Sequence, residues 1–262
     1  MDYLREFNKL LQEVDYSKSI SQKFNDFLTM TAYSIAQPFY RSDEFEDKYL
    51  DVAKNYKKEQ HNNFSEMFTI VIDALEVPQD FLGQIFSTNA MGASYTGQFF
   101  TPYHVSKLMA EILNVDVKEK LKHKNFITLS EPCVGSGGMV IAFAQTMQEQ
   151  GLNYQDKLYV EAVDIDDICY KMAYIQLSLL GIPAKVIKGD SLNLKFQEVL
   201  YTPMFFINSF DYKLKLMQDE LVAGQKINKE AEFADKIIEI TEVKKESFIE
   251  EIRLKDIQLR LF

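Results

Sequence analysis

Apolar residues recur at helical spacing over the first third of the chain. Between Leu4 and Val14, and again between Phe24 and Met30, they return every three or four positions. This is the pattern of helices that bury one face against a core. Runs rich in β-forming residues are scarce before Phe86. Residues 1–88 are therefore predicted to form a helical N-terminal region.

The pattern changes between Ser87 and Phe100, where glycine, serine and asparagine gather and predict a loop. Thr101 and Pro102 then predict the start of a new helix, because threonine caps helices well and proline fits the first helical turn. Apolar residues at helical spacing are expected to form the buried stripe of this helix. They are Val105, Leu108, Met109 and Ile112.

Strand-like and helix-like segments alternate from residue 126 onward, as they do in a doubly wound α/β fold. The predicted strands are Phe126–Leu129, Leu158–Ile165, Ala184–Ile187 with its end at Gly189-Asp190, and Met204–Ile207. The predicted helices between them are Met139–Gln148 and Ile168–Leu180. Residues 89–212 are thus predicted to form an α/β domain with a short parallel sheet.

The remaining segment, residues 213–262, is rich in lysine, glutamate, isoleucine and leucine at helical spacing. This composition predicts a charged amphipathic helical tail of one or two helices. The simplest interpretation is that the tail caps the sheet or packs on a partner.

Composition narrows the class of protein. A net charge of −10 argues against strong autonomous binding to nucleic acid, which depends on lysine and arginine meeting phosphates. An acidic chain can still act on DNA if a partner protein grips it. No apolar run is long enough to cross a membrane. Cys133 and Cys169 have no metal-ligand spacing with the histidines, so a cytoplasmic protein without a metal site is expected.

One loop carries most of the candidate chemistry. Glu131 to Gly138, here called the glycine loop, joins the first predicted strand to the helix after it. Gly135 and Gly137 allow a tight turn and close approach of a ligand, and the helix start offers free N–H groups. Glu131 would repel a pyrophosphate but attract the positively charged methionyl end of S-adenosylmethionine. The loop therefore predicts an S-adenosylmethionine site.

Acidic residues end three successive predicted strands: Glu131, Asp164 and Asp190. The carboxyl ends of parallel strands line one crevice, so these side chains are expected to converge. Asp164 is suited to accept both ribose hydroxyls, and Asp190 to accept from an adenine amino group. Each acid alone is commonly a cap or turn residue. Together with the glycine loop they favour a cofactor site.

Three other sites fit the glycine loop less well. A nicotinamide site needs a third glycine where Val140 stands, and a phosphate-binding P-loop needs a lysine followed by serine or threonine. Pro132-Cys133 has the letters of a cytosine-methylating nucleophile, but it sits in the cofactor loop. A small buried cysteine is the better interpretation of Cys133.

Four motifs follow in order along the chain: Gly97–Pro102, Glu131–Gly138, Val163–Asp166 and Gly189–Leu192. In order and spacing they resemble the motifs of adenine-N6 DNA methyltransferases, most closely the modification subunits of type I restriction systems. The resemblance implies an α/β, Rossmann-like S-adenosylmethionine-dependent methyltransferase fold, here with a shortened sheet and a helical N-terminal region.

The resemblance also implies a role for each motif residue in holding S-adenosylmethionine. Thr101 would hold the methionine carboxylate and Glu131 the ammonium, while Gly135 and Gly137 give the cofactor room. Asp164 would bind the ribose and Asp190 the adenine ring. Ile165 would pack on the adenine face, although an ordinary core isoleucine is an equally good interpretation.

The catalytic motif of the resembled family is an Asn or Asp, two prolines and an aromatic residue after the fourth strand. These groups hold a flipped adenine and orient its amino group. The chain contains no such motif. The nearest match is Asn208-Ser209-Phe210, in which Asn208 and Phe210 are the candidate catalytic residues; Tyr201-Thr202-Pro203 is a second, weaker match.

The sequence thus leaves three hypotheses. The first is an adenine-N6 DNA methyltransferase that meets DNA with the help of a partner protein. The second is a catalytically silent cofactor-binding or interaction protein that acts on restriction-modification systems. The third, a methyltransferase for small molecules or proteins, explains neither the Gly97–Pro102 motif nor the helical region.

Overall fold

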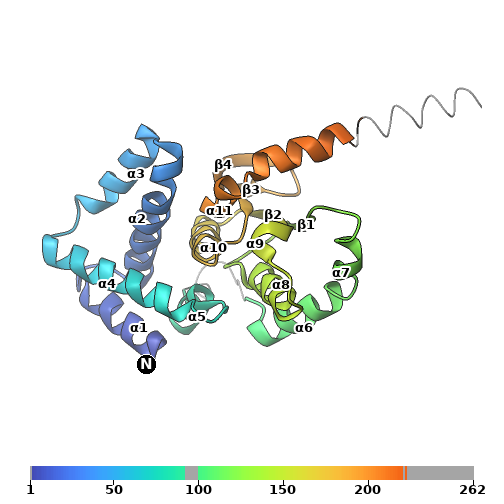
Figure 1. The fold of residues 1–262 in the computed structure, drawn as a ribbon. Helices are drawn as coiled ribbons and strands as arrows, with labels where there is room; N and C mark the ends of the chain where they lie inside the picture. Colours follow the sequence, from blue (N-terminus) through green and yellow to red (C-terminus); the bar gives the residue numbers. More distant parts are fainter. Residues whose placement is uncertain (1, 92–99, 221, 223–262) are drawn as a thin grey trace, which may run out of the picture. The chain divides into compact units, whose positions relative to one another are not determined.

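The computed structural model describes residues 2–91, 100–220 and 222, and Figure 1 shows its fold. The chain divides into two compact units, Met1–Phe210 and Asp211–Phe262. In the second unit residues 211–220 are helical. The rest of the predicted tail lies outside the described residues, as do Gly97, Gln98 and Phe99 of the first motif. The predicted division at residue 88 stays a prediction.

Helices alone make up the described structure up to residue 91. They are α1 (Tyr3–Glu13), α2 (Ile20–Tyr40), α3 (Asp43–Ala53), α4 (Lys58–Ala74) and α5 (Phe81–Thr88). Side chains of Asp2, Ser19, Ser42 and Asp80 cap four of them by accepting from backbone N–H groups. Phe7 packs edge-on against Phe24, Phe27 and Phe81 in the core. The predicted helical character of this region is confirmed.

An α/β arrangement follows in the same unit. Its elements are α6 (Tyr103–Leu113), α7 (Val117–Lys120), β1 (Ile127–Glu131), α8 (Gly138–Glu149), α9 (Tyr154–Lys157), β2 (Leu158–Asp164), α10 (Asp167–Leu179), β3 (Ala184–Asp190), β4 (Lys195–Tyr201) and α11 (Pro203–Ile207). The sheet has the order β1-β2-β3-β4, with the first three strands parallel. The predicted α/β fold with a shortened sheet is confirmed.

The order of the strands decides where the helices lie. Because β1, β2 and β3 are neighbours in chain order, right-handed crossovers bring α8 and α10 onto the same face of the sheet (Figure 1). Val160 and Ala162 of the internal strand β2 are fully buried, as are Val140 of α8 and Met172 of α10. This apolar layer explains why the three parallel strands were readable from the sequence.

The fourth strand was predicted in the wrong place. Residues Met204–Ile207 belong to helix α11, which begins at Pro203. The strand is instead β4, which returns antiparallel to β3. Proline at the first helical position favours a helix start, and Phe205 packs against Tyr201 at 4.3 Å between ring centroids. An apolar run with aromatic residues therefore forms a helix that packs beside the sheet.

The helix after Pro102 also departs from its prediction. Pro102 itself is the N-cap of α6, and Thr101 is exposed without capping the helix. The predicted stripe exists but faces outward, with Ile112 66 % exposed. Small residues, Ser106 and Ala110, form the buried face instead. Spacing identified an apolar face correctly, but small side chains allow the closer packing and so take the inner side.

A partly buried carboxylate joins the first helices to the sheet. Glu198 of β4 accepts hydrogen bonds from the hydroxyls of Tyr33 and Tyr170, at 2.8 and 3.2 Å. It also pairs with the ammonium of Lys48 at 2.5 Å. Burial beside this carboxylate raises the pKa of Tyr33 and of Tyr170 far above the usual range. Residues from α2, α3 and α10 thus meet at one strand.

Candidate functional site at the carboxyl ends of the strands

The three predicted acids lie at the carboxyl ends of adjacent strands. Glu131 ends β1, Asp164 ends β2 and Asp190 ends β3. The strands are staggered, because Glu131 is level with Ala162 and Asp164 is level with Lys188. Each acid therefore extends two residues past the acid of the strand before it. The parallel sheet brings all three to one edge, as expected.

Glu131 is a half-buried carboxyl beside a second acid. Burial raises its pKa, the nearby charge of Asp164 raises it further, and a hydrogen bond from the Cys133 N–H opposes both. That hydrogen bond is long, at 3.4 Å. Cys133 itself is exposed, so the prediction of a buried cysteine is wrong. A carboxylate that is partly desolvated and weakly bonded gains most from a cationic group placed against it.

Asp164 is held more firmly. Its Oδ2 accepts from the Gly135 N–H at 2.8 Å, and its Oδ1 accepts from the Asp166 N–H at 2.9 Å. Burial raises the pKa of Asp164, although these two hydrogen bonds act in the opposite direction. A carboxylate has about four acceptor positions, so each oxygen can accept one more hydrogen bond. This geometry suits a vicinal diol whose two hydroxyls both donate.

Asp190 differs from the other two acids. It accepts from the N–H groups of Leu192 and Asn193, at 2.9 and 3.1 Å, and from the side-chain amide of Asn193. These hydrogen bonds lower the pKa of Asp190. The structure therefore shows Asp190 as a turn residue, the alternative noted from the sequence. One acceptor position of its carboxylate is still available for a ligand.

The glycine loop has the backbone that its sequence predicts. Gly135 and Gly137 have φ values of 55° and 98°, in the left-handed region that favours glycine. A Cβ on Gly135 would lie 3.1 Å from the ring of Phe100. The segment that leads into α6 therefore packs on the loop, and Thr101 follows directly. Glycine is required here both by conformation and by close approach.

Ile165 is not a core residue. Its side chain is 64 % exposed directly after Asp164, so the core interpretation is wrong. An exposed branched apolar side chain next to a carboxylate that can bind a sugar is suited to cover the face of an attached planar ring.

Asn208 and Phe210 lie at the other end of the strands. Phe210 is fully buried and packs against Phe126, directly before β1, and against Tyr159 near the start of β2. The Asn208 amide donates to the carbonyl of Gln155, three residues before β2, at 2.6 Å. The structure thus separates this pair from the three acids. The catalytic interpretation of Asn208 and Phe210 has no support from this position.

Sequence reasoning missed a buried polar group beneath the glycine loop. Asp80, the N-cap of α5, is 6 % exposed and accepts from the Ser136 hydroxyl at 2.6 Å. A cap signal was present, because Asp80 precedes an apolar helix-like segment. No local pattern indicates a contact across 56 positions, however.

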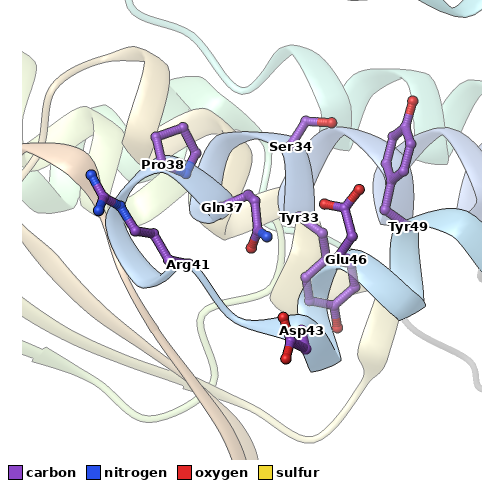
Figure 2. Close-up of a pocket in the computed structure, with 8 residues that line it drawn as sticks. All are labelled: Tyr33, Ser34, Gln37, Pro38, Arg41, Asp43, Glu46 and Tyr49. Carbon is purple, nitrogen blue, oxygen red and sulfur yellow. The ribbon is translucent and has the colours of Figure 1, made fainter.

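A separate hollow lies between α2 and α3. Figure 2 shows its lining, which comes from residues between Tyr33 and Tyr49, with Arg41 towards one end and Tyr49 towards the other. Its volume is about 580 Å³ and it is open to solvent. None of the three strand-end acids lines it. This hollow is therefore distinct from the crevice predicted for the cofactor.

Across residues 2–91, 100–220 and 222, no helix is both long and apolar enough to span a membrane. The same residues contain no group of three or more histidine, cysteine or acidic side chains able to hold a metal ion.

Comparison with known proteins gives one family. A family model described as N-6 DNA Methylase matches residues 76–252. No curated protein matches the chain.

Two solved structures resemble parts of it. One is described as a class I S-adenosylmethionine-dependent methyltransferase from Listeria monocytogenes. The two chains are 14% identical with a TM-score of 0.43, and the match covers 73% of this chain and 54% of the Listeria protein. The other is a type I restriction-modification system methyltransferase subunit from Streptococcus thermophilus. The two chains are 15% identical with a TM-score of 0.36, and the match covers 73% of this chain and 58% of the Streptococcus protein. This chain spans little more than half the length of either protein.

Proposed function

The chain belongs to the N-6 DNA methylase family, and we propose that it binds S-adenosylmethionine at the carboxyl ends of β1, β2 and β3. The observation that carries the proposal is Asp164. It is held by the Gly135 N–H of the glycine loop and keeps acceptor capacity on both oxygens. A ribose with two adjacent hydroxyls matches that arrangement.

The other residues at this edge support the same cofactor. Glu131 would face the methionine ammonium. Burial raises the pKa of this carboxyl, and a cation placed against it would stabilise its ionised form. Gly135 and Gly137 would leave room for the cofactor, and Thr101 would hold its carboxylate. Asp190 would accept from the adenine amino group. Ile165, already exposed, would cover the adenine ring.

We further propose that the reaction is methyl transfer to the N6 amino group of adenine in DNA. When bound, S-adenosylmethionine supplies a methyl group on a positively charged sulfur. The chain's own part is to orient that cofactor with Glu131 and Asp164. Its net charge of −10 disfavours a strong grip on DNA, so a partner protein of a restriction-modification system would supply those contacts.

A second candidate function has a specific observation in its favour. The chain has no pair of adjacent prolines, and its nearest match to the catalytic motif lies at the amino ends of the strands, with Phe210 buried between aromatic rings. A protein that binds the cofactor without transferring the methyl group, and that acts on restriction-modification systems by interaction, would show these properties.

One experiment separates these functions. S-adenosylmethionine is titrated into the full chain by calorimetry, and the chain is then incubated with labelled cofactor and adenine-containing DNA. Both steps are repeated with candidate restriction-modification subunits. Binding with label transfer to adenine supports the enzyme. Binding without transfer, together with a stable complex with a subunit, supports the interaction protein. No binding in either setting overturns the cofactor proposal.

A further inference from the structure

The carboxylate of Asp80 is enclosed by two segments that are distant in sequence. Its Oδ1 accepts from the Gly83 N–H at 3.0 Å and from the Gln176 amide at 2.9 Å. Its Oδ2 accepts from the hydroxyl of Ser136 at 2.6 Å. The Gly83 bond caps α5, whereas the other two reach α10 and the glycine loop. One side chain therefore links the helical N-terminal region to the candidate cofactor site.

Gln176 completes the link and is itself fully buried. Its amide nitrogen donates to the Ser136 carbonyl at 2.7 Å as well as to Asp80. Its amide oxygen accepts from the Leu82 N–H at 3.0 Å. Ser136 is thus held at both its hydroxyl and its carbonyl. Ser136 lies between the two left-handed glycines, Gly135 and Gly137.

The residues around the Asp80 carboxylate are closely packed. A Cβ on Gly83 would lie 2.2 Å from Asp80 Oδ2 and 2.5 Å from the Ser136 hydroxyl oxygen. A Cβ on Gly138 would lie 3.1 Å from the same carboxylate oxygen. Glycines on both sides let α5 and the loop approach closely enough for the hydrogen bonds to form.

The anchored residue is adjacent to the group that holds Asp164. Gly135, whose N–H donates to Asp164, directly precedes Ser136. Glycines have wide conformational freedom. The Gly137 N–H donates to the Val134 carbonyl, and the Val134 N–H donates to the Val163 carbonyl, each at 2.9 Å, but neither bond involves Ser136. A restraint on Ser136 therefore limits where the Gly135 N–H can point. The path from Asp80 to Asp164 runs through one residue of the loop.

We propose that Asp80 is a positioning residue of the cofactor site. By holding Ser136 directly and through Gln176, it fixes the glycine loop in the conformation in which Gly135 donates to Asp164. The inference rests on the proposed function for its effect on S-adenosylmethionine, but its effect on the loop can be measured in the free protein.

Hydrogen bonding is the expected basis of this role. An asparagine in place of Asp80 keeps one acceptor for Gly83 and Gln176, and its amide can donate to the Ser136 oxygen. Alanine keeps none of these bonds. The substitution Asp80→Asn should therefore preserve the loop, whereas Asp80→Ala should release it.

The experiment measures amide hydrogen exchange of residues 131–138 in the full chain, together with the affinity for S-adenosylmethionine. In Asp80→Ala, exchange in the loop should rise and affinity should fall, each about tenfold, as expected for a buried bond that is lost. In Asp80→Asn, the exchange rate of the loop and the affinity should both stay close to those of the unaltered chain. Ser19→Ala removes a cap of the same kind from α2, far from the loop in sequence, and should leave both unchanged.

A double-mutant cycle tests the path itself. If Asp80 acts through the loop on Asp164, the affinity losses of Asp80→Ala and Asp164→Ala should be less than additive. Additive losses would contradict the proposed path. A general loss of stability would not produce this coupling.

The remaining outcomes are distinguishable. Unchanged loop exchange in Asp80→Ala overturns the inference, and so does faster exchange with unaltered affinity. If Asp80→Ala does not fold, Ser136→Ala, which removes only the hydroxyl, carries the same expectation. If the unaltered chain binds no S-adenosylmethionine but its loop still loosens in Asp80→Ala, the proposed function fails while the anchoring of the loop is supported.

Discussion

The two ends of the parallel strands contain similar residue types and use them differently. At the amino ends, Phe210 is enclosed by two aromatic rings and Asn208 is hydrogen-bonded to the backbone. At the carboxyl ends, Glu131 and Asp164 have raised pKa values and Ile165 is exposed. The amino end satisfies its polar and apolar groups internally. The carboxyl end retains acceptors and apolar surface, which is what a binding site requires.

The largest expected effect concerns stability at the amino end. Phe210→Ala removes a fully buried ring and should lower the free energy of unfolding by about 3 to 5 kcal/mol. Denaturant titration of the full chain measures this loss. S-adenosylmethionine affinity of the folded variant should stay unchanged. A large loss of affinity in a folded variant would mean that the two ends are not functionally separate.

The next effect concerns affinity at the carboxyl end. Asp164→Ala removes a charged acceptor and should cost about 1.5 to 3 kcal/mol per hydrogen bond to the cofactor, roughly tenfold or more in affinity. Calorimetric titration measures it. Asn208→Ala is the matched control at the opposite end, because it also removes a partly buried hydrogen bond but should not change affinity. Equal affinity of the unaltered chain, Asp164→Ala and Asn208→Ala for the cofactor would refute the assignment of Asp164 to the ribose.

A third effect is a dependence of cofactor affinity on pH. A cation binds best to ionised carboxylates, and the raised pKa values of Glu131 and Asp164 mean that both take up protons above the usual acidic range. Affinity should therefore be constant at neutral pH and fall as the pH drops through these raised values. Asp190, whose pKa is lowered, stays ionised there.

Titration at a series of pH values measures this dependence. In Glu131→Gln, affinity should be lower at neutral pH and should change less on acidification. An unaltered pH profile in that variant would contradict the role of Glu131 with the cofactor's ammonium group.

The smallest effect should come from Ile165. Covering its side chain with a ring is expected to stabilise the complex by about 1 kcal/mol, so Ile165→Ala should weaken binding roughly fivefold. Its exposure implies a change in folding stability of less than about 0.5 kcal/mol. Calorimetric titration measures the change in affinity, and denaturant unfolding measures the change in stability. A large loss of stability with intact binding would instead indicate a packing role.

The sequence predicted the elements that have a regular apolar pattern, and it missed the features that depend on contacts between distant residues. β2, β3 and the helices α8 and α10 were predicted because buried parallel strands and their helices carry continuous apolar signals. β1 has exposed polar residues and was predicted from its place before the glycine loop. β4 was missed because an edge strand with exposed, charged residues carries a weak signal. The outward stripe of α6 shows that spacing identifies an apolar face but not the direction in which it points.

The candidate site divides in the same way. Glu131, Asp164 and the glycine loop were predictable because strand ends and glycines are local signals with a shared geometry. Asp80 was missed because its partners, Ser136 and Gln176, are 56 and 96 positions away. Its isolated sequence signal is that of any helix cap.

The enclosed carboxylate of Asp80 limits how this protein can be cut or recombined. A fragment that starts at residue 89 would contain all four family-like motifs, yet it would take away the acceptor that serves Ser136 and Gln176. Those two donors would lose their buried protein acceptor, and water would have to take its place. If related proteins exchange segments, we therefore expect the first helices and the glycine loop to be inherited together.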